Sequence, residues 1–295
     1  MGPRYEFGRI ISSGMIGNVY LAEAKDNKSV VCIKQMLGKK MAEKNIFQSV
    51  RRELKILNEV QKIDGCIKIF DVITDPSSLS LVMPWYPLGD LYFYAKVSPE
   101  RVMKQKDAQH ICRQMVQILS GIHEMGIIHR DLKPENLLVA DSKFTIQLSD
   151  FGFAIKEKEL FKEGLFTRVG TLEFYPIEML LPGCCPLKRG DDKIWYDRRV
   201  DIWSLGVIIF ELLYGHTPFY TPSQVAILPD GKKVDRKDDM TKDKIRSLRY
   251  KFPKLRTGAV YTEAEDLFRR IFVKPDERIT LAEMKQHPWL LKKLE

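Results

Sequence analysis

The chain has 295 residues, of which 44% are hydrophobic and 29% charged, and it carries a formal net charge of +9. This composition is typical of a soluble globular protein with enough apolar residues for a sizeable core. No apolar run is long enough to cross a bilayer, the N-terminus lacks the apolar segment of a secretory signal, and Glu6 breaks the myristoylation pattern. We therefore expect a cytoplasmic or nuclear protein that does not associate with membranes.

The cysteines and the excess of basic residues predict neither a metal centre nor a nucleic-acid partner. Five cysteines without paired spacing fit a reducing compartment, and the pair Cys184-Cys185 has no second pair or histidine cluster nearby. Lysines and arginines are not interleaved with the aromatic residues that stack on bases. We interpret the positive charge as a solvated basic surface.

The N-terminal part has the periodicity of a small β-rich unit with one helix. Residues 5–35 alternate around a glycine-bearing turn, as strands do. Residues 44–60 predict a helix with one apolar face. That face consists of Phe47, Val50, Leu54 and Leu57. Two further strands are expected at Ile67–Val72 and Leu79–Met83.

After about residue 87 the pattern becomes helical. One helix is expected at 104–125, with Ile111, Met115, Ile118, Leu119 and Ile122 on its buried face. Another, at Ile202–Tyr214, is apolar nearly all round and should lie deep in the core. A short apolar strand is expected at Phe144–Leu148.

Two segments, 182–199 and 228–244, are rich in charged residues and are expected to be exposed loops. Together these patterns predict one domain over 1–295, with a small β-rich lobe up to about residue 86 and a large helical lobe from about residue 87.

The first candidate site is a turn whose glycines recur at the spacing of a phosphate-binding loop. Gly14, Gly17 and Val19 fit this pattern, whereas Ser12 stands where its first glycine would be. Without a Cβ, glycine lets backbone N–H groups approach phosphate oxygens. An ordinary β-hairpin turn explains the same residues equally well, so this motif gains weight only from those that follow.

The second candidate is a lysine within an apolar strand. Lys34 follows Val31-Cys32-Ile33, and an ammonium group is unfavourable in such a strand unless its charge is paired. Glu53 on the expected helix is the candidate partner, and the pair would hold the ammonium against ATP phosphates. The alternative is a surface lysine on an edge strand.

The strongest signal is a run in which a carboxylate, an ammonium and an amide follow one another closely, His129-Arg130-Asp131-Leu132-Lys133-Pro134-Glu135-Asn136. Asp131 can orient an attacking hydroxyl and accept its proton. Lys133 can neutralise charge on a phosphoryl group in transfer, and Asn136 can ligate a hard cation through its side-chain oxygen. Asp150, in Asp150-Phe151-Gly152, is expected to bind the Mg²⁺ that bridges ATP phosphates.

With these motifs, the sequence resembles the eukaryotic protein kinase superfamily over nearly its whole length. The resemblance continues through Gly170-Thr171-Leu172-Glu173, Pro176-Ile177-Glu178, Asp201-Ile202-Trp203-Ser204-Leu205-Gly206 and Arg278. It implies a two-lobed α+β protein kinase fold that binds ATP and Mg²⁺ in a cleft. It also implies an ion pair between Glu178 and Arg278 and a role for Asp201 in anchoring the catalytic loop.

The resemblance also assigns residues to the nucleotide. Met83 matches the gatekeeper, and adenine would bond to the backbone N–H of Tyr86 and the C=O of Pro84. Cys32 takes the place of the usual alanine over the adenine ring and could react with a covalent ligand. The ATP-binding residues implied are Ile11, Ser12, Gly14, Gly17, Val19, Cys32, Lys34, Glu53, Pro84, Tyr86, Asp90 and Leu138. His129 is expected to be a packed core residue with Leu57, Ile69 and Phe151 rather than a base.

Substrate preference follows from the same resemblance. Lys133 is typical of serine/threonine kinases, and Phe153 of kinases that favour serine. The residues implied in substrate binding are Asp90, Glu135, Glu211 and Leu172. The three acidic residues among them match positions that receive arginines upstream of the phosphoacceptor, although ordinary solvated carboxylates would look the same.

Regulation is expected through Thr167, through the two insertions, or through an activating protein that docks on the small lobe. Thr167 matches an activating phosphothreonine, and Arg130 is its expected counter-ion. Phosphorylation would then order residues 153–175.

Within the superfamily, the sequence most resembles the Aurora kinases. The shared segments are Gly17-Asn18-Val19-Tyr20-Leu21-Ala22, Pro87-Leu88-Gly89 and Gly170-Thr171-Leu172-Glu173. The Pro84-Trp85 hinge, the two insertions and the absence of arginines just before Thr167 depart from that group. Another basophilic or calcium/calmodulin-kinase-like enzyme and a catalytically silent scaffold remain alternatives. A small-molecule kinase is disfavoured because residues 167–178 match a peptide-docking loop.

Overall fold

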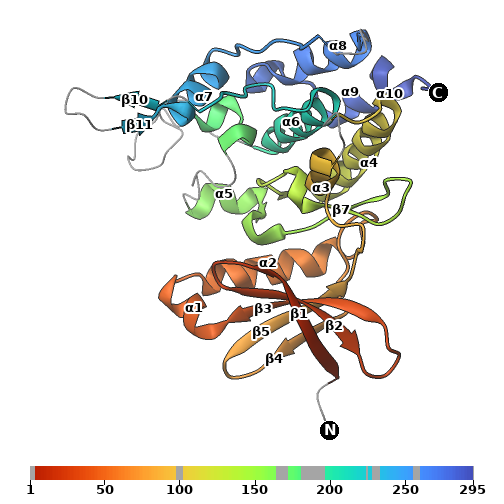
Figure 1. The fold of residues 1–295 in the computed structure, drawn as a ribbon, viewed down its shortest axis with the longest axis vertical. Helices are drawn as coiled ribbons and strands as arrows, with labels where there is room; N and C mark the ends of the chain where they lie inside the picture. The colour runs from red at the N-terminus through yellow and green to blue at the C-terminus, as the bar shows by residue number, and fades with distance from the viewer. Residues whose placement is uncertain are drawn as a thin grey trace.

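The computed structural model describes residues 4–97, 102–163, 172–180, 197–223, 225–227, 233–254 and 260–294. They form a β-rich N-terminal lobe and a larger helical C-terminal lobe, stacked along the long axis of the molecule (Figure 1). This arrangement confirms the predicted α+β class. Of the helices in the described ranges, none combines the length and the apolar character needed to span a membrane.

The N-terminal lobe is built on a five-stranded antiparallel sheet with the order β1-β2-β3-β5-β4. Its strands are β1 (Tyr5–Ser13), β2 (Gly17–Ala24), β3 (Val30–Leu37), β4 (Asp71–Thr74) and β5 (Ser78–Pro84). The central strand β3 alternates between two environments, as a pleated strand does. Val31 and Ile33 are buried on one face, whereas Cys32 and Lys34 are half-buried on the other. The alternation therefore places Lys34 on the face of the sheet opposite Val31 and Ile33.

The strand predicted from Ile67 to Val72 was placed too early, because β4 begins only at Asp71. The backbone N–H groups of Ile67 and Ile69, which precede β4, form hydrogen bonds outside the sheet. The N–H of Ile67 donates to a carbonyl of the C-terminal lobe at 2.9 Å, and the N–H of Ile69 donates to the side-chain oxygen of Gln61 at 2.9 Å. These bonds keep residues 67–69 out of the ladder, whereas the N–H of Phe70 already donates to the carbonyl of Val82 on β5 at 2.8 Å.

Helix α2 (Phe47–Val60) lies beside the sheet and follows a short helix, α1 (Gly38–Glu43), which was not predicted. α2 begins later than residue 44 because Asn45 has a φ of 51°, a left-handed conformation that interrupts a helix. Phe47 was expected on the buried face but is 51% exposed, so that part of the prediction was wrong. The residues that α2 buries are Val50, Glu53, Ile56, Leu57 and Val60.

The C-terminal lobe is organised around α6 (Arg199–Tyr214), in which every residue except Arg199 and Glu211 is buried. This confirms the helix predicted to be apolar all round. The other helices of this lobe are α3 (Leu91–Val97), α4 (Gln105–Glu124), α5 (Glu157–Glu163), α7 (Lys237–Arg246), α8 (Thr262–Ile271), α9 (Leu281–Lys285) and α10 (Pro288–Leu291). The apolar face predicted for 104–125 is the buried face of α4.

Two short antiparallel pairs position the motifs recognised in the sequence. β6 (Ile127–Ile128) pairs with β9 (Ile155–Lys156), and β7 (Leu137–Val139) pairs with β8 (Ile146–Leu148). Residues 129–136 form the loop between β6 and β7, and Asp150 follows β8. The two motifs therefore leave neighbouring short strands in the same region of the lobe.

The prediction of an exposed loop over 228–244 was partly wrong. β10 (Val225–Ile227) pairs with β11 (Lys233–Asp235), and α7 follows directly. α7 buries only Thr241 and Ile245, so its apolar periodicity is too sparse to be recognised among lysines and aspartates. Of the segment 182–199, only residues 197–199 lie within the described ranges, and Arg199 begins α6.

Candidate active site

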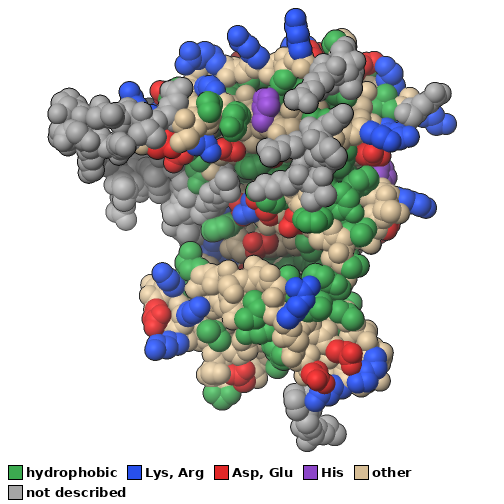
Figure 2. Space-filling model, in the orientation of Figure 1, with side chains coloured by type: hydrophobic (Ala, Val, Ile, Leu, Met, Phe, Trp, Pro, Cys, Tyr) green, Lys and Arg blue, Asp and Glu red, His purple; other side chains and the backbone are tan. Residues whose placement is uncertain are grey.

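Lys34 of β3 meets two carboxylates at the junction of the two lobes. Its Nζ lies 2.7 Å from Oε1 of Glu53 on α2 and 3.4 Å from Oδ1 of Asp150. Glu53 is buried, whereas Asp150 is exposed, and acidic side chains are visible in the hollow between the lobes (Figure 2). Burial lowers the pKa of Lys34, but the two carboxylates outweigh it and raise this pKa above its ordinary value. Lys34 is therefore cationic at neutral pH.

Asp150 owes its orientation to an unusual backbone conformation. Its φ of 56° is left-handed, a conformation that aspartate tolerates better than most residues. The next residue, Phe151, is fully buried, so the turn separates a core ring from a carboxylate that contacts Lys34. Loss of hydration at the lobe junction raises the pKa of Asp150, but the charge of Lys34, together with smaller contributions that include hydrogen bonds from Lys34 and from the Gly152 N–H, outweighs it, and the pKa of this carboxyl is lowered. Asp150 is thus ionised at neutral pH.

The side chains of Asp131, Lys133 and Asn136 meet within the loop between β6 and β7. The Lys133 ammonium donates to Oδ2 of Asp131 at 2.6 Å. The Asn136 amide donates to the backbone carbonyl of Asp131 at 2.7 Å and to its Oδ2 at 3.2 Å. Because both bonds use the nitrogen of Asn136, its side-chain oxygen faces away from Asp131. One carboxylate oxygen thus holds both neighbours, while the second accepts no hydrogen bond from the described residues.

Asp201, at the start of α6, holds this loop from inside the lobe. Its Oδ1 accepts the backbone N–H of Arg130 at 2.9 Å, and its Oδ2 accepts the N–H of His129 at 2.9 Å. Arg130 has a φ of 67°, a conformation that costs roughly 1 kcal/mol or more for a residue with a side chain. Burial raises the pKa of Asp201, but the hydrogen bond and charge of His123, together with smaller contributions that include the His129 N–H, outweigh it and lower this pKa. A buried, ionised carboxylate therefore stabilises the strained loop.

His129 is a packing residue, and both of its ring nitrogens are engaged. Nδ1 accepts the backbone N–H of Asp131 at 3.3 Å, so Nε2 must be the nitrogen that donates to the carbonyl of Ser149 at 3.1 Å. The ring is fully buried and packs edge-to-face on Phe151, with centroids 5.0 Å apart. This geometry leaves the ring no role as a proton acceptor from a substrate.

The side-chain oxygens of Asn136 and Asp150 are the ligands that Mg²⁺ prefers, and they suit its usual mode of binding. Mg²⁺ commonly takes one or two protein oxygens and completes its shell with water and substrate phosphates. Within the described ranges, no group of three or more His, Cys, Asp or Glu residues could hold a metal alone. Cys184 and Cys185 lie outside the described residues.

The residues expected around ATP come from adjacent elements. In the sheet, Cys32 lies opposite Met83, and Val31 lies opposite Pro84. Asp90 forms an isolated bridge with Leu138 of β7, which brings the chain after β5 next to the catalytic loop. The strands thus place residues predicted to bind ATP within one region. Ile11, Val19, Cys32, Pro84, Tyr86, Asp90 and Leu138 are all half-buried.

The glycine-bearing turn is closed by a bond from the N–H of Gly14 to the carbonyl of Gly17 at 2.8 Å. A Cβ at Gly17 would lie 1.7 Å from the carbonyl oxygen of Gln35, so only glycine fits there. Ser12 and Gly14 are exposed at the rim of the lobe. Burial raises the pKa of Cys32 to about 11, although Lys34 opposes this shift, so the thiol is protonated at neutral pH.

The residues expected to bind substrate occupy different environments. Glu135 is exposed, Glu211 is half-buried on α6, and Leu172 is half-buried against the core. Oδ1 of Asp90 accepts the N–H of Phe93 at 2.9 Å, so this carboxylate also stabilises the start of α3.

The expected regulatory pair is described only in part. Thr167 lies outside the described residues. Nε of Arg130 donates to the carbonyl of Phe153 at 2.8 Å, and its side chain is buried beside the catalytic loop.

One connection between the lobes was missed from the sequence. Lys156 of β9 forms an ion pair with Glu59 of α2, and its ammonium also donates to the carbonyl of Met125 at 2.9 Å. The pair joins the helix that carries Glu53 to the strand that follows Asp150. Lys156 stands in the run Lys156-Glu157-Lys158-Glu159, whose alternating charges look like an exposed surface and provided no signal.

Comparisons with known proteins agree with this geometry. Residues 5–290 match the family model described as protein kinase domain. The chain is 30% identical to an Aurora kinase of Debaryomyces hansenii, over 97% of this chain and 62% of that protein. It is 28% identical to Aurora kinase C of Mus musculus, over 97% of this chain and 91% of that protein. It is also 28% identical to Aurora kinase A-A of Xenopus laevis, over 98% of this chain and 62% of that protein. The chain thus spans less than two thirds of two of these relatives.

Proposed function

The chain belongs to the protein kinase domain family, and on that premise we propose that it transfers the γ-phosphate of ATP to serine or threonine hydroxyls of proteins. The observation that carries the proposal is the presence of two charged groups at the lobe junction. Lys34 is paired with Glu53 and contacts Asp150, while Asp131 is bonded to both Lys133 and Asn136.

The first group suits the binding of ATP with Mg²⁺. Lys34, held by Glu53, would contact phosphate oxygens, and Asp150 and Asn136 would hold the metal. When bound, Mg²⁺ neutralises part of the phosphate charge. Since Lys34 stays cationic and Asp150 stays ionised at neutral pH, both are in the protonation state that these roles require.

The second group suits transfer of the phosphoryl group. The substrate hydroxyl oxygen would form a bond to the γ-phosphorus while the bond from that phosphorus to the β–γ bridging oxygen breaks. Asp131 would orient the hydroxyl and accept its proton. Lys133, 2.6 Å from Asp131, would neutralise charge on the phosphoryl group in transit.

Transfer of radiolabelled phosphate to an arrayed peptide library tests this function, with the wild type compared with Asp131→Asn. Transfer that disappears in the variant supports the proposal. The absence of transfer from the wild type, even after Thr167 is phosphorylated or an activator is added, would favour a catalytically silent scaffold instead.

We further propose that the enzyme is Aurora-like and prefers serine or threonine with upstream basic residues, in the cytoplasm or nucleus. The named relatives support the first part, and the exposed carboxylate of Glu135 supports the second. If the phosphorylated peptides in the library lack upstream arginine or lysine, the basic preference is wrong while the kinase activity stands.

Activation is proposed to involve phosphorylation of Thr167, with Arg130 as the counter-ion. The position of Arg130 beside Asp131, with its guanidinium bonded to the carbonyl of Phe153, supports this role, because it would connect the phosphate to both motifs. Undiminished activity of Thr167→Ala would contradict it.

An activating protein is proposed to dock on the N-terminal lobe. A groove of about 210 Å³ lies between α2, β4 and β5, and is lined by residues that include Leu54 and Leu57. Phe70 and Val72 at this groove are 60% and 46% exposed, which is unusual for large apolar side chains. Phe70→Glu should abolish stimulation by such a partner and leave basal activity unchanged.

A further inference from the structure

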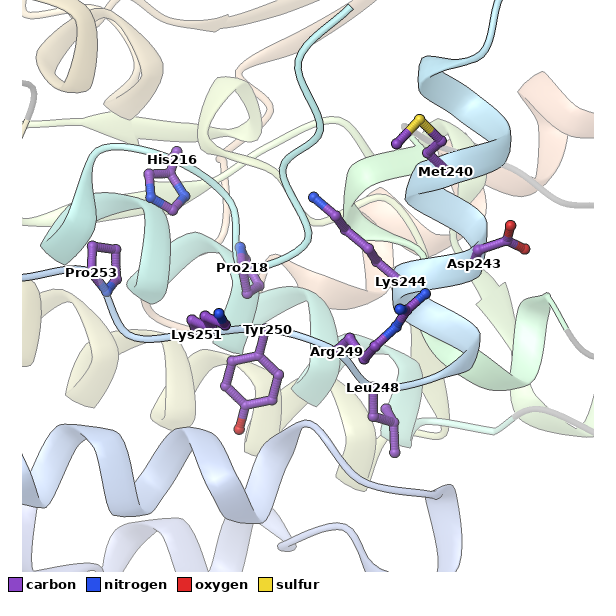
Figure 3. Close-up of a pocket in the computed structure, with 10 residues that line it drawn as sticks. All are labelled: His216, Pro218, Met240, Asp243, Lys244, Leu248, Arg249, Tyr250, Lys251 and Pro253. Carbon is purple, nitrogen blue, oxygen red and sulfur yellow. The ribbon is translucent and has the colours of Figure 1, made fainter. Parts of the chain in front are cut away.

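A second pocket, of about 960 Å³, lies in the C-terminal lobe and shares no lining residue with the candidate active site. It is formed by the chain that follows α6, by α7 and by residues 248–253 (Figure 3). Its described lining combines apolar residues with cations. The apolar residues include Pro218, Met240 and Leu248, and the cations are Lys244, Arg249 and Lys251. Asp243 is the single carboxylate among the described lining residues.

Carboxylates of the described residues do not compensate the cations Lys244 and Arg249 of this pocket. The Lys244 ammonium donates to the carbonyl of Tyr220 at 2.5 Å, and Nε of Arg249 donates to the hydroxyl of Ser247 at 2.8 Å. Among the residues that the structure describes, neither cation forms an ion pair, and Asp243 is paired with Arg246 at 3.6 Å. Burial and the charge of Arg249 lower the pKa of Lys244. An anion in the pocket would relieve this repulsion.

A strained turn brings Lys244 and Arg249 together. α7 ends at Arg246, and Leu248 then adopts a φ of 51°, in the left-handed region normally taken by glycine. The N–H of Leu248 donates to the carbonyl of Ile245 at 3.1 Å, and the N–H of Arg249 donates to that of Lys244 at 2.9 Å, which is a Schellman motif. A leucine in this position costs about 1 kcal/mol or more. The turn fixes Arg249 against the last turn of the helix.

The shape and chemistry of the pocket favour a segment of protein over a nucleic acid or a membrane. Apolar walls accommodate apolar side chains, while the cations attract carboxylates. Base stacking needs a free aromatic ring, but both rings of the described lining already contact other rings. Tyr250 packs against Phe219, Phe252 and Phe272, and His216 lies against Phe210 and Tyr220. A hollow of this kind also fits a flat lipid surface poorly.

The pocket borders the part of the lobe where substrate is expected. Lys237, at the start of α7, forms an ion pair with Glu173 at 3.0 Å. Glu173 directly follows Leu172, one of the residues expected to bind substrate. A segment held against α7 would therefore be anchored near the phosphoacceptor.

We propose that the pocket between α7 and residues 248–253 is a docking site for an acidic segment of a protein substrate, in which aspartates or glutamates alternate with apolar residues. The inference rests on the proposed kinase function and extends it to substrate choice. Good substrates would be bipartite, with a serine or threonine in a basic context and an acidic docking segment elsewhere in the chain.

A binding experiment tests the site without reference to catalysis. The probe is a fluorescein-labelled peptide of about 12 residues in which glutamate alternates with leucine and phenylalanine, followed by fluorescence anisotropy. Lys244→Gln and Arg249→Gln should each weaken binding about fivefold or more. Because neither side chain forms an ion pair with any described residue, both variants should fold normally. Lys242→Gln, on the same helix but outside the pocket, is the matched control and should bind as the wild type does. Equal affinity in all four proteins would overturn the proposal, as would tighter binding of single-stranded DNA or phosphoinositide vesicles that depends on the same two residues.

A kinetic experiment then tests the role in substrate choice. The acidic segment is joined to a basic phosphoacceptor peptide through Gly-Ser linkers of about 10 to 20 residues, which reach roughly 15 to 25 Å. The attached segment should lower KM about tenfold in the wild type but not in the Lys244→Gln/Arg249→Gln protein, while KM for the unattached peptide stays the same in both. An equal effect in both proteins, or none, overturns docking. If neither protein phosphorylates the unattached peptide, the proposed kinase function is refuted. The anisotropy result would still decide whether the pocket binds acidic segments.

Discussion

The buried ion pair between Glu178 and Arg278 allows a stability prediction to be worked out from contacts. Two parallel bonds of 2.6 and 2.8 Å join the side chains, which are 1% and 0% exposed. The guanidinium also donates to the backbone carbonyls of Ile271, Arg199 and Val273, and lies 4.9 Å over the ring of Trp203. Every N–H group of Arg278 thus has a partner in a site without water access.

Glu178→Gln keeps the shape of the side chain and removes its charge, which leaves a buried cation. Breaking such a pair costs about 3–5 kcal/mol. Arg278→Met should cost more, because it leaves a buried carboxylate and also three carbonyls without their donor, at roughly 1–3 kcal/mol for each unsatisfied group. Urea unfolding followed by tryptophan fluorescence measures both differences, since Trp203 reports on the site directly.

Glu277→Gln is the matched control, because Glu277 is exposed and adjacent in sequence to Arg278. Its free energy of unfolding should stay within about 0.5 kcal/mol of the wild type. A loss below about 1 kcal/mol for Glu178→Gln, or a larger loss for it than for Arg278→Met, would refute this account of the pair.

Three further predictions concern the cleft. Asp131→Asn should lower kcat about 10²- to 10⁴-fold and leave the binding of a fluorescent ATP analogue nearly unchanged, because Asp131 acts on the hydroxyl and not on the nucleotide; turnover at the wild-type rate would contradict the assigned role. Lys156→Met should reduce kcat about two- to fivefold, since a partly exposed ion pair to Glu59 contributes up to about 1 kcal/mol to keeping α2 in place. Lys158→Met, at an exposed position nearby, should have no effect, and equal losses in the two variants would argue against the pair. Because its pKa is about 11, Cys32 should have a thiolate fraction of only about 10⁻⁴ at pH 7. Its alkylation by iodoacetamide, followed by mass spectrometry, should therefore rise about tenfold per pH unit between pH 7 and 9. Rapid labelling at pH 7 would show that burial does not raise the pKa of this thiol.

The parts of the site that could be predicted from the sequence depended either on closeness within one motif or on a charge that must be paired. Asp131, Lys133 and Asn136 lie within one loop, so their convergence follows from the run itself. The pairing of Lys34 with Glu53 was inferred from the cost of an unpaired ammonium in an apolar strand. Both inferences used the chemistry of single residues and needed no knowledge of tertiary contacts.

Where prediction failed, side chains or backbone conformations overrode the local pattern. The early part of the strand predicted at 67–72 was lost because Gln61, six to eight residues earlier, bonds to the backbone of Ile67 and Ile69. The pair of Lys156 with Glu59 joins two runs that each look like solvated surface. In both cases the deciding partner lies on another element, and hydrophobic periodicity carries no information about it.

The docking pocket is another feature that hydrophobic periodicity does not predict. Helix ends are usually recognised by glycine or asparagine in the left-handed position, but here Leu248 occupies it, within Ser247-Leu248-Arg249-Tyr250. A sequence without that signal predicts no turn, and therefore no approach of Arg249 to Lys244. Since a non-glycine residue in this conformation persists only when its surroundings enforce it, Leu248→Gly should relieve the strain and leave α7 intact. Loss of acidic-peptide affinity in that variant, despite unchanged or higher stability, would show that Leu248, which also lines the pocket, serves binding rather than folding.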